Sequence, residues 1–154
     1  MSAYRIVALP GDGTGREVMT EALKVLDVFQ KNGDVEFEIK VIPCGGQHYL
    51  KTGEQWPEGS FEICRDESDA ILLGAIGWPD ARLPNGDVAG GEVILGLRSG
   101  LDLYANVRPV KLYQGVHHKV HGVYKEIWKS SLVDLVMVRA VSYTHLTLPT
   151  KVTV

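Results

Sequence analysis

The sequence predicts an α/β protein with a mostly parallel sheet flanked by helices, and three observations support this. Residues 5–10 and 69–74 are short apolar runs, typical of strands buried in a parallel sheet. The segment between them contains helical periodicity and a further strand-like alternation. Strands and helices therefore alternate along the chain, as they do in a parallel sheet built with right-handed crossovers.

The first strand, 5–10, ends at a proline and a glycine, and a helix is expected to follow from residue 13 or 14. Thr14 and Glu17 are spaced as a capping pair, and Asn32–Gly33 supplies a stop signal. The expected buried stripe of this helix is Val18, Ala22, Val25, Leu26 and Phe29.

The later elements follow from the same rules. Residues 35–42 alternate apolar and charged side chains, so one face of this strand should be exposed to solvent and the strand should lie near an edge of the sheet. Segment 76–91 contains four glycines and two prolines, which predicts a long surface loop, and such loops often carry function. The remaining predicted elements are helices at 46–51, 57–66 and 92–99 and strands at 104–110 and 133–138.

Composition excludes several classes of protein. A net charge of -3 gives no electrostatic reason to expect nucleic acid or an anionic membrane as a partner. No apolar run approaches the roughly 18 residues needed to span a bilayer, and residues 1–5 enter a strand without a leader pattern. Cys44 and Cys64 lack metal-ligand or CxxC spacing, so we expect a protein of the reducing cytoplasm without a cysteine-based centre.

A glycine-rich turn, Gly11-Asp12-Gly13-Thr14-Gly15, lies between the first strand and the first helix. Its GxGxG spacing differs from the GxGxxG dinucleotide fingerprint, and Glu36 and Glu38 fit the expected downstream acidic residue only loosely. Two roles stay open for these glycines, a structural turn and a cofactor contact. Asp12 is interpreted as a turn or cap residue and not as a catalyst.

Two arginines ten residues apart, Arg98 and Arg108, predict a site for a di-acid. A guanidinium is permanently charged and offers a rigid fork of donors that matches a carboxylate. Asn106 lies two residues before Arg108, so both side chains should point to the same face of a strand. The alternative is that each arginine lies on the surface with its stem on apolar neighbours.

The stretch Leu-Arg-x-x-x-x-Leu-Tyr-Ala-Asn-x-Arg-Pro around these arginines, with Gly11–Gly15 and Leu72–Gly77, resembles the isocitrate/isopropylmalate dehydrogenase family over about residues 4–139. The resemblance implies a truncated form of that family's fold, NAD or NADP, and Mg²⁺ or Mn²⁺. It also implies oxidative decarboxylation of a small di- or tricarboxylic 2-hydroxy acid, and a homodimeric parent protein. The alternatives are a non-catalytic nucleotide- or anion-binding α/β module and a regulatory partner subunit.

The resemblance also assigns residues. Arg98 and Arg108 correspond to arginines that clamp substrate carboxylates, and Arg139 to a third arginine of the site. The loop Gly74, Ala75, Ile76 and Gly77 would lie beside the nicotinamide and phosphate of the dinucleotide, or serve only as a strand end, and its continuation Trp78-Pro79-Asp80 departs from the family pattern. Ile94 and Leu95 would face the substrate's side chain, or belong to the core.

One departure concerns substrate choice. Gly91 stands seven residues before Arg98, where isopropylmalate enzymes usually carry an acidic residue, and Glu92 comes one position later. This weakens isopropylmalate as the substrate and leaves isocitrate, tartrate or malate open. No hydroxyl-bearing side chain at Ile94 or Leu95 favours isocitrate specifically.

The domain organisation is predicted in three parts. Residues 1–100 would be the N-terminal part of a large cofactor-binding domain, and 101–140 the start of a second domain for substrate binding and dimerisation. Residues 141–154 resemble the conceptual translation of a transposase adapter used in sequencing libraries, and are interpreted as a non-native tail; a genuine β-rich tail is the alternative.

The family's catalytic tyrosine and lysine and its aspartate metal ligands would all lie beyond this point. We therefore expect an inactive, aggregation-prone product in which no catalytic or metal-binding residue is present. Tyr143 belongs to the tail and is not a substitute for the family tyrosine. His117, His118 and His121 are not expected to bind a metal, because Gly115 and Gly122 flank them and disfavour a helix.

Overall fold

The structure is a computed structural model that describes residues 3–33 and 35–140. The chain divides into two compact units, Met1–Leu101 and Asp102–Val154. This division lies one residue beyond the predicted boundary. The roles predicted for the two parts stay predictions, and the proposed tail, 141–154, lies outside the described residues.

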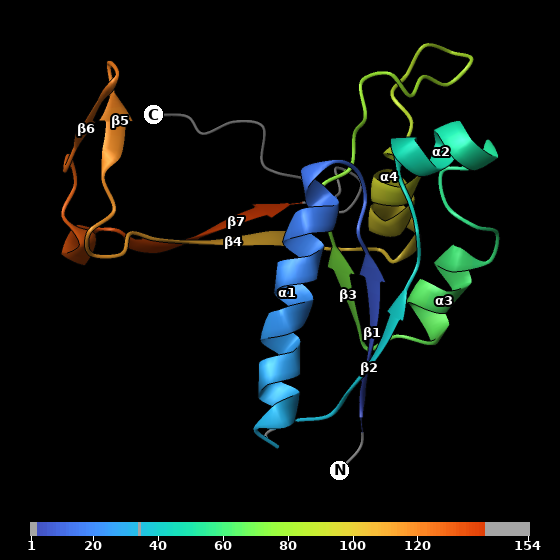
Figure 1. Cartoon of the computed structure of the whole chain (residues 1–154), viewed down its shortest axis with the longest axis horizontal. Helices are drawn as coiled ribbons and strands as arrows, with labels where there is room; N and C mark the ends of the chain where they lie inside the picture. Colours follow the sequence, from blue (N-terminus) through green and yellow to red (C-terminus); the bar gives the residue numbers. More distant parts are fainter. Residues whose placement is uncertain (1–2, 34, 141–154) are drawn as a thin grey trace, which may run out of the picture. The chain divides into compact units, whose positions relative to one another are not determined.

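The first unit is built on a parallel sheet of three strands with the order β2-β1-β3 (Figure 1). The central strand β1, Tyr4–Leu9, pairs with β2, Phe37–Val41, on one side and with β3, Ala70–Leu73, on the other. Residues 6–9 of β1 are buried, as expected for the middle strand of a covered parallel sheet. The predicted α/β fold, and the edge position of the alternating strand among the described strands, are confirmed.

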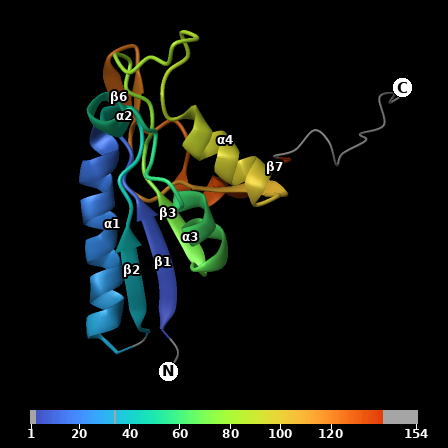
Figure 2. The ribbon, with the colours of Figure 1, turned by 90° about the vertical axis from the view of Figure 1, so that its right-hand side faces the viewer.

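Helices cover both faces of this sheet. Figure 2 shows α1, Thr14–Lys31, on one face and α3, Ser60–Asp66, with α4, Gly91–Gly100, on the other. The short helix α2, Gly46–Thr52, lies near the carboxyl ends of the strands. The predicted long loop before α4 is confirmed, with a single bridge between Arg82 and Val88 inside it.

The core of the first unit lies on the α3 and α4 side of the sheet. It combines residues of β1 with both cysteines and two residues of α4: Val7, Leu9, Ile42, Cys44, Cys64, Val93 and Leu97. Both cysteines are free and buried. Burial raises the pKa of the Cys44 thiol to about 11 and also raises the pKa of Cys64, so neither is an activated thiolate.

Two details predicted for α1 are wrong. Gly13, not a hydroxyl side chain, occupies the N-cap, and no side chain caps this end. The helix also buries a different stripe, in which Gly15 and Met19 are buried and Ala22 and Leu26 half-buried, whereas Val18, Val25 and Phe29 stay exposed. The physical reason is Gly15: a Cβ there would lie 2.6 Å from the Ala75 carbonyl oxygen, so this close approach sets the rotation of the helix.

The second unit consists of an antiparallel ribbon and a hairpin. The ribbon pairs β4, Ala105–Lys111, with β7, Asp134–Ala140. The hairpin pairs β5, His118–Val120, with β6, Val123–Lys125, and a 3₁₀ turn, Ser130–Leu132, precedes β7. Both ribbon strands were predicted, but the hairpin was not.

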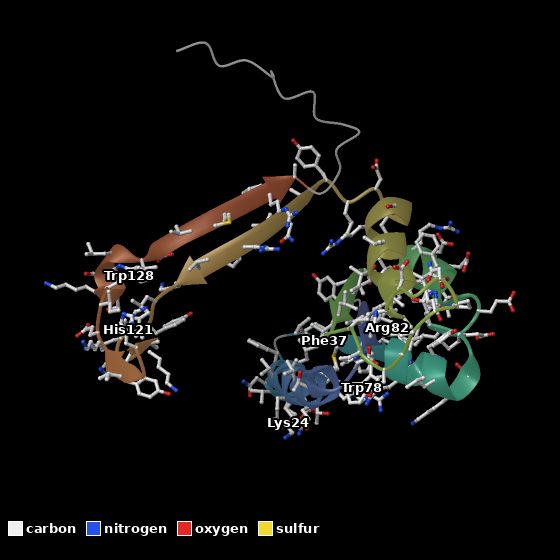
Figure 3. All side chains as sticks on the ribbon, turned by 90° about the horizontal axis from the view of Figure 1, so that it is seen from above. Lys24, Phe37, Trp78, Arg82, His121 and Trp128 are labelled. Atoms are coloured by element: carbon white, nitrogen blue, oxygen red, sulfur yellow. The ribbon has the colours of Figure 1, made fainter. Side chains whose placement is uncertain are left out.

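The hairpin turns at His121 and Gly122, which both have positive φ values of 50° and 81°. Two consecutive residues with positive φ match the tight turns that suit right-twisted hairpins. Figure 3 shows His121 and Trp128 in this part of the chain. The Trp128 ring lies edge-on to the His118 ring, with the two ring centroids 5.0 Å apart. Within residues 3–33 and 35–140, no helix has the length and apolarity to cross a bilayer.

Candidate functional site

The β4–β7 ribbon brings three of the predicted substrate residues onto one face. Asn106 pairs directly with Arg139, and directly opposed residues of an antiparallel ribbon point to the same side. Arg108 lies two residues after Asn106 and shares that side, and its Nε donates a hydrogen bond to Asn106 Oδ1 at 3.3 Å. The predicted common face of Asn106 and Arg108 is therefore present.

This face is cationic. Its other strand positions are apolar, at Val110, Leu135 and Met137. The ion pair of the ribbon, Lys111 Nζ to Asp134 Oδ2 at 3.3 Å, involves residues that alternate to the opposite face. None of the salt bridges found in the described part of the chain involves Arg108 or Arg139. Two guanidinium groups beside one carboxamide are suited to a carboxylate or phosphate ligand.

The helix α4, in the first unit, carries the other three predicted residues. It buries Val93 and Leu97 in the core, and this orientation leaves Leu95 61% exposed, Arg98 exposed and Ile94 half-buried. The alternative that Leu95 belongs to the core is therefore wrong. Since residues four apart on a helix are neighbours, Ile94 and Arg98 form one apolar and cationic strip.

The start of α4 is held by a residue that the sequence analysis missed. Gln55 Oε1 accepts hydrogen bonds from the backbone N–H groups of Gly90 at 2.5 Å and Glu92 at 3.3 Å. Gln55 Nε2 donates to Glu92 Oε2 at 2.8 Å. Gln55 thereby caps the helix from 35 residues away, and no local pattern signals a cap at this distance.

Gly91 and Glu92 differ in what surrounds them. A Cβ on Gly91 would meet no atom within 4 Å, so this position is open. The Glu92 carboxylate is engaged by Gln55 and lines a cavity with it. Glu92 thus has a structural partner of its own and does not stand in for an acidic residue at position 91.

Asp12 ties the glycine-rich turn to two other segments. Its carboxylate is buried and accepts hydrogen bonds from the N–H groups of Gly46 at 2.8 Å, Gln47 at 2.7 Å and Gly77 at 2.9 Å. Two of these donors belong to the first turn of α2, so Asp12 caps that helix. The interpretation of Asp12 as a cap residue agrees with this geometry.

The glycines of the turn are required by close packing against the loop after β3. A Cβ on Gly11 would lie 2.1 Å from the Ala75 carbonyl oxygen, and one on Gly74 would lie 2.1 Å from the Pro10 carbonyl oxygen. The Asp12 N–H donates to the same Ala75 oxygen at 2.7 Å. The structural role considered for Gly11 and Gly15 is therefore observed, and protein atoms already occupy the space beside them.

The predicted cofactor loop, 74–77, is partly accessible after this packing. Ala75 and Gly77 are exposed, whereas Gly74 and Ile76 are half-buried. Trp78 lies next to Gly13, since a Cβ on Gly13 would be 3.5 Å from the Trp78 ring. Figure 3 shows Trp78 in the first unit, on the same loop as Arg82. Within the described ranges, no three His, Cys, Asp or Glu side chains are grouped so that they could hold a metal ion.

The described chain consists of an α/β unit, with a parallel sheet covered on both faces, and a second unit whose ribbon has a cationic face. A family model described as isocitrate/isopropylmalate dehydrogenase matches residues 5–143. The chain therefore belongs to the isocitrate/isopropylmalate dehydrogenase family, as the sequence motifs indicate. The match ends within the segment predicted to be a tail, which lies outside the described residues.

Named relatives agree with this family. The chain is similar to the 3-isopropylmalate dehydrogenase of Thermotoga maritima, with 44% identity over 142 residues, covering 90% of this chain and 39% of that protein. It is 39% identical over 139 residues to the 3-isopropylmalate dehydrogenase of Clostridium acetobutylicum, covering 90% of this chain and 38% of that protein. The chain thus spans about two fifths of the length of these relatives.

Solved structures show the same fold. Isocitrate dehydrogenase from Methylococcus capsulatus matches 89% of this chain and 34% of its own, with a TM-score of 0.64 and 25% identity. A β-decarboxylating dehydrogenase from Thermococcus kodakarensis, in its apo form, matches 88% of this chain and 41% of its own, with a TM-score of 0.54 and 27% identity. The described fold is accordingly part of the fold of these enzymes.

Proposed function

We propose that this chain is part of an NAD(P)-linked oxidative decarboxylase of a 2-hydroxy di- or tricarboxylic acid. The observation that carries the proposal is the ribbon face shared by Asn106, Arg108 and Arg139, which carries two guanidinium groups and a carboxamide. Membership of the isocitrate/isopropylmalate dehydrogenase family supports it. For the 154-residue chain alone we expect binding without turnover, since it spans only part of the length of its relatives.

In this proposal each arginine orients a carboxylate. On the ribbon, Arg108 and Arg139 would hold a carboxylate of the substrate, and on α4 Arg98 is likewise proposed to bind a carboxylate. Correct orientation alone can lower an activation barrier by several kcal/mol, up to about 10 kcal/mol in well-aligned systems. Asn106 would keep Arg108 in position through their hydrogen bond.

The substrate is proposed to carry an apolar substituent at C3. Leu95 is 61% exposed on the same helix as Arg98, and an apolar surface of this kind favours a hydrocarbon group over a third carboxylate. The relatives named 3-isopropylmalate dehydrogenase agree with this choice. The open position at Gly91 leaves room for a bulkier or differently shaped group.

The dinucleotide, NAD or NADP, is proposed to lie against the exposed residues Ala75 and Gly77. They follow a parallel strand at its carboxyl end, where open α/β sheets bind their ligands. When bound, the nicotinamide supplies the hydride acceptor. The described residues do not fit a Mg²⁺ or Mn²⁺ site, since they contain no group of three ligating side chains, so no step is assigned to a metal.

We also propose that the longer parent protein is a cytoplasmic homodimer. Exposed apolar side chains on the β4–β7 ribbon support this proposal, because they could form a subunit interface. Val107 and Val138, for example, are 59% and 64% exposed. Analytical ultracentrifugation of the full-length parent would show a dimer under this proposal.

The test of the binding role is calorimetric titration of the 154-residue chain with 3-isopropylmalate. Arg98→Ala and Arg108→Ala should each weaken binding at least tenfold, whereas Arg65→Ala, an exposed arginine paired with Asp66, should not change it. Equal binding by all variants would contradict the assignment. Unchanged binding of a nucleotide without any organic-acid binding would favour the alternative of a non-catalytic nucleotide-binding module.

A further inference from the structure

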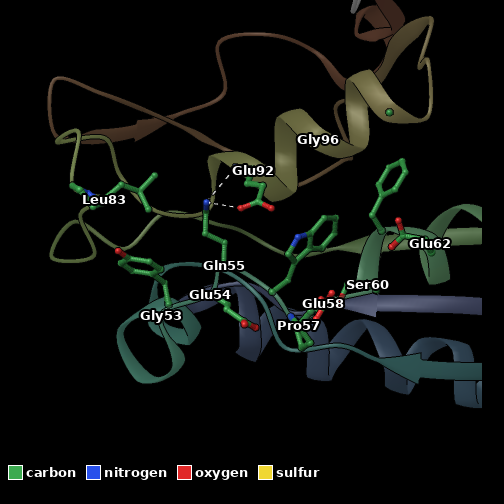
Figure 4. Close-up of a pocket in the computed structure, with 16 residues that line it drawn as sticks. Gly53, Glu54, Gln55, Pro57, Glu58, Ser60, Glu62, Leu83, Glu92 and Gly96 are labelled. Atoms are coloured by element: carbon green, nitrogen blue, oxygen red, sulfur yellow. Dashed lines mark hydrogen bonds between the residues drawn. The ribbon is translucent and has the colours of Figure 1, made fainter.

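The first unit contains a cavity that the proposed reaction does not use. It has a volume of about 870 Å³ and lies between the segment that joins α2 to α3 and one side of α4 (Figure 4). Glu92, Gly96 and Gly100 line it from α4, spaced about one turn apart. Arg98, two residues from Gly96, points to the opposite side of the helix. The cavity is thus separate from the strip that carries the proposed substrate residues.

Three aromatic side chains contribute to the cavity wall. Tyr49, Trp56 and Phe61 all line it, and each is half-buried. Trp56 and Phe61 also pack against the core, so their positions are held from behind. The guanidinium of Arg65 lies 5.5 Å from the centre of the Phe61 ring, within the range of a cation–π contact.

The α4 side of the cavity is unfilled at Gly96. A Cβ on Gly96 would meet no atom within 4 Å, although the residue lies in the interior of a helix. Glycine at such a position costs about 1 kcal/mol relative to alanine. Gly100, by contrast, is needed for packing, because a Cβ there would lie 2.5 Å from the Phe61 ring. The free space at Gly96 therefore lies between Glu92, which is hydrogen-bonded to Gln55, and Gly100, which packs against Phe61.

The charges in the cavity are all of one sign. Four glutamates line it, Glu54, Glu58, Glu62 and Glu92, and the lining includes no lysine, arginine or histidine. Figure 4 shows them distributed along the cavity, with Glu62 toward one side of the view and Glu92, hydrogen-bonded to Gln55, between Leu83 and Glu62. Among the described residues no three acidic groups converge as metal ligands do. Separated carboxylates with aromatic surface between them suit an extended organic cation.

We propose that this cavity binds a linear aliphatic polyamine. The methylene chain would lie against Trp56 and the open backbone of Gly96, with one ammonium group at Glu92 and another at Glu58 and Glu62. Residues 92 and 100 are eight positions apart, which gives about 12 Å along the helix axis. A compact cation such as a metal ion would contact only one end of this space.

The first test blocks the cavity without removing a charge. Calorimetric titration of the full 154-residue chain with spermidine should show one site. Gly96→Leu should weaken binding at least tenfold, because the added side chain fills the free space and also favours the helix. Ser99→Leu is the matched control, since it adds the same side chain at an exposed position of α4 that does not line the cavity. Circular dichroism checks that both variants keep their helices.

The second test separates a defined site from general attraction to an acidic protein. The double variant Glu58→Gln and Glu62→Gln should lose at least tenfold in spermidine affinity. Glu17→Gln with Glu36→Gln makes the same change in net charge away from the cavity and should have less than a twofold effect. Equal losses in the two double variants, no spermidine binding by the unmodified chain, or full binding by Gly96→Leu would each overturn the proposal.

Discussion

The two units of this chain differ in how they are held together. Every buried apolar residue in the described part of the chain lies between Ile6 and Leu97, and none lies between 102 and 140. The first unit is therefore stabilised by burial of apolar surface, whereas the second relies on the hydrogen bonds of a two-stranded ribbon and a hairpin. Isolated two-stranded structures are only marginally stable in water.

The comparison teaches that the ribbon face proposed to bind a carboxylate lies outside the packed core, whereas Arg98 and the proposed polyamine cavity belong to the unit that contains the core. Asn106, Arg108 and Arg139 lie on the unit without a core, where apolar side chains such as Val136 and Val138 are exposed. Binding of an acid by that unit would add stability by mass action. Substitutions of buried residues in the first unit should therefore alter the folding of the chain, while those on the ribbon of the second should alter mainly ligand binding.

The largest expected effect is at the packed glycine turn. Gly11→Ala should lower the free energy of unfolding by about 3 kcal/mol or more, because its Cβ would clash with the Ala75 carbonyl and its φ is +73°. Gly33→Ala has a similar φ of +77° but open space around it, so it should cost only about 1 kcal/mol. Urea denaturation followed by circular dichroism measures both, and equal losses would show that the contact with Ala75 is unimportant.

The next effect compares one carboxylate in each unit. Asp12→Ala should cost about 3 kcal/mol, because it leaves three backbone donors without their buried acceptor. Asp134→Ala removes only an exposed ion pair with Lys111 and should cost between about 0 and 1 kcal/mol. A large loss in the Asp134 variant, measured by the same denaturation, would mean that the second unit is as strongly held as the first.

A third effect tests the distribution of apolar burial. Val93 is fully buried on α4, and Val93→Ala should cost about 2 kcal/mol through lost transfer energy and the cavity left behind. Val138 is 64% exposed on β7, so Val138→Ala should change stability by less than about 0.5 kcal/mol. If both variants lost the same stability, Val138 would have to be covered in solution by another surface.

The last effect, absent at neutral pH, is a pH dependence that originates in the first unit. Burial raises the pKa of Cys44 from 9.0 to about 11, so the folded state holds this proton more tightly than the unfolded state. The corresponding stability is fully present below pH 9.0 and is lost as the pH rises toward 11. Hydrogen exchange of β1 should detect this loss, and Cys44→Ala should reduce it. If Cys44→Ala lost the same stability at alkaline pH as the unmodified chain, other titrating groups would be responsible for that loss.

Much of the fold could be predicted from local patterns. The apolar run at 69–74 and the alternation at 35–42 indicate strands because side-chain periodicity reports directly on burial. The shared side of Asn106 and Arg108 follows from the two-residue repeat of a strand. The hairpin at 118–125 was missed, because its strands are three residues long each and carry too little periodicity to detect.

By itself the sequence determined the order of strands and helices in the first unit, the family, and the residue types available for an organic acid. These depend on periodicity and on motifs that are contiguous in the chain. The tertiary structure alone decided which stripe of α1 is buried, how Gln55 caps α4, and the pairing that sets Arg139 opposite Asn106. Each of these joins segments more than 30 residues apart, and such contacts are settled by packing and strand register, which no local pattern encodes.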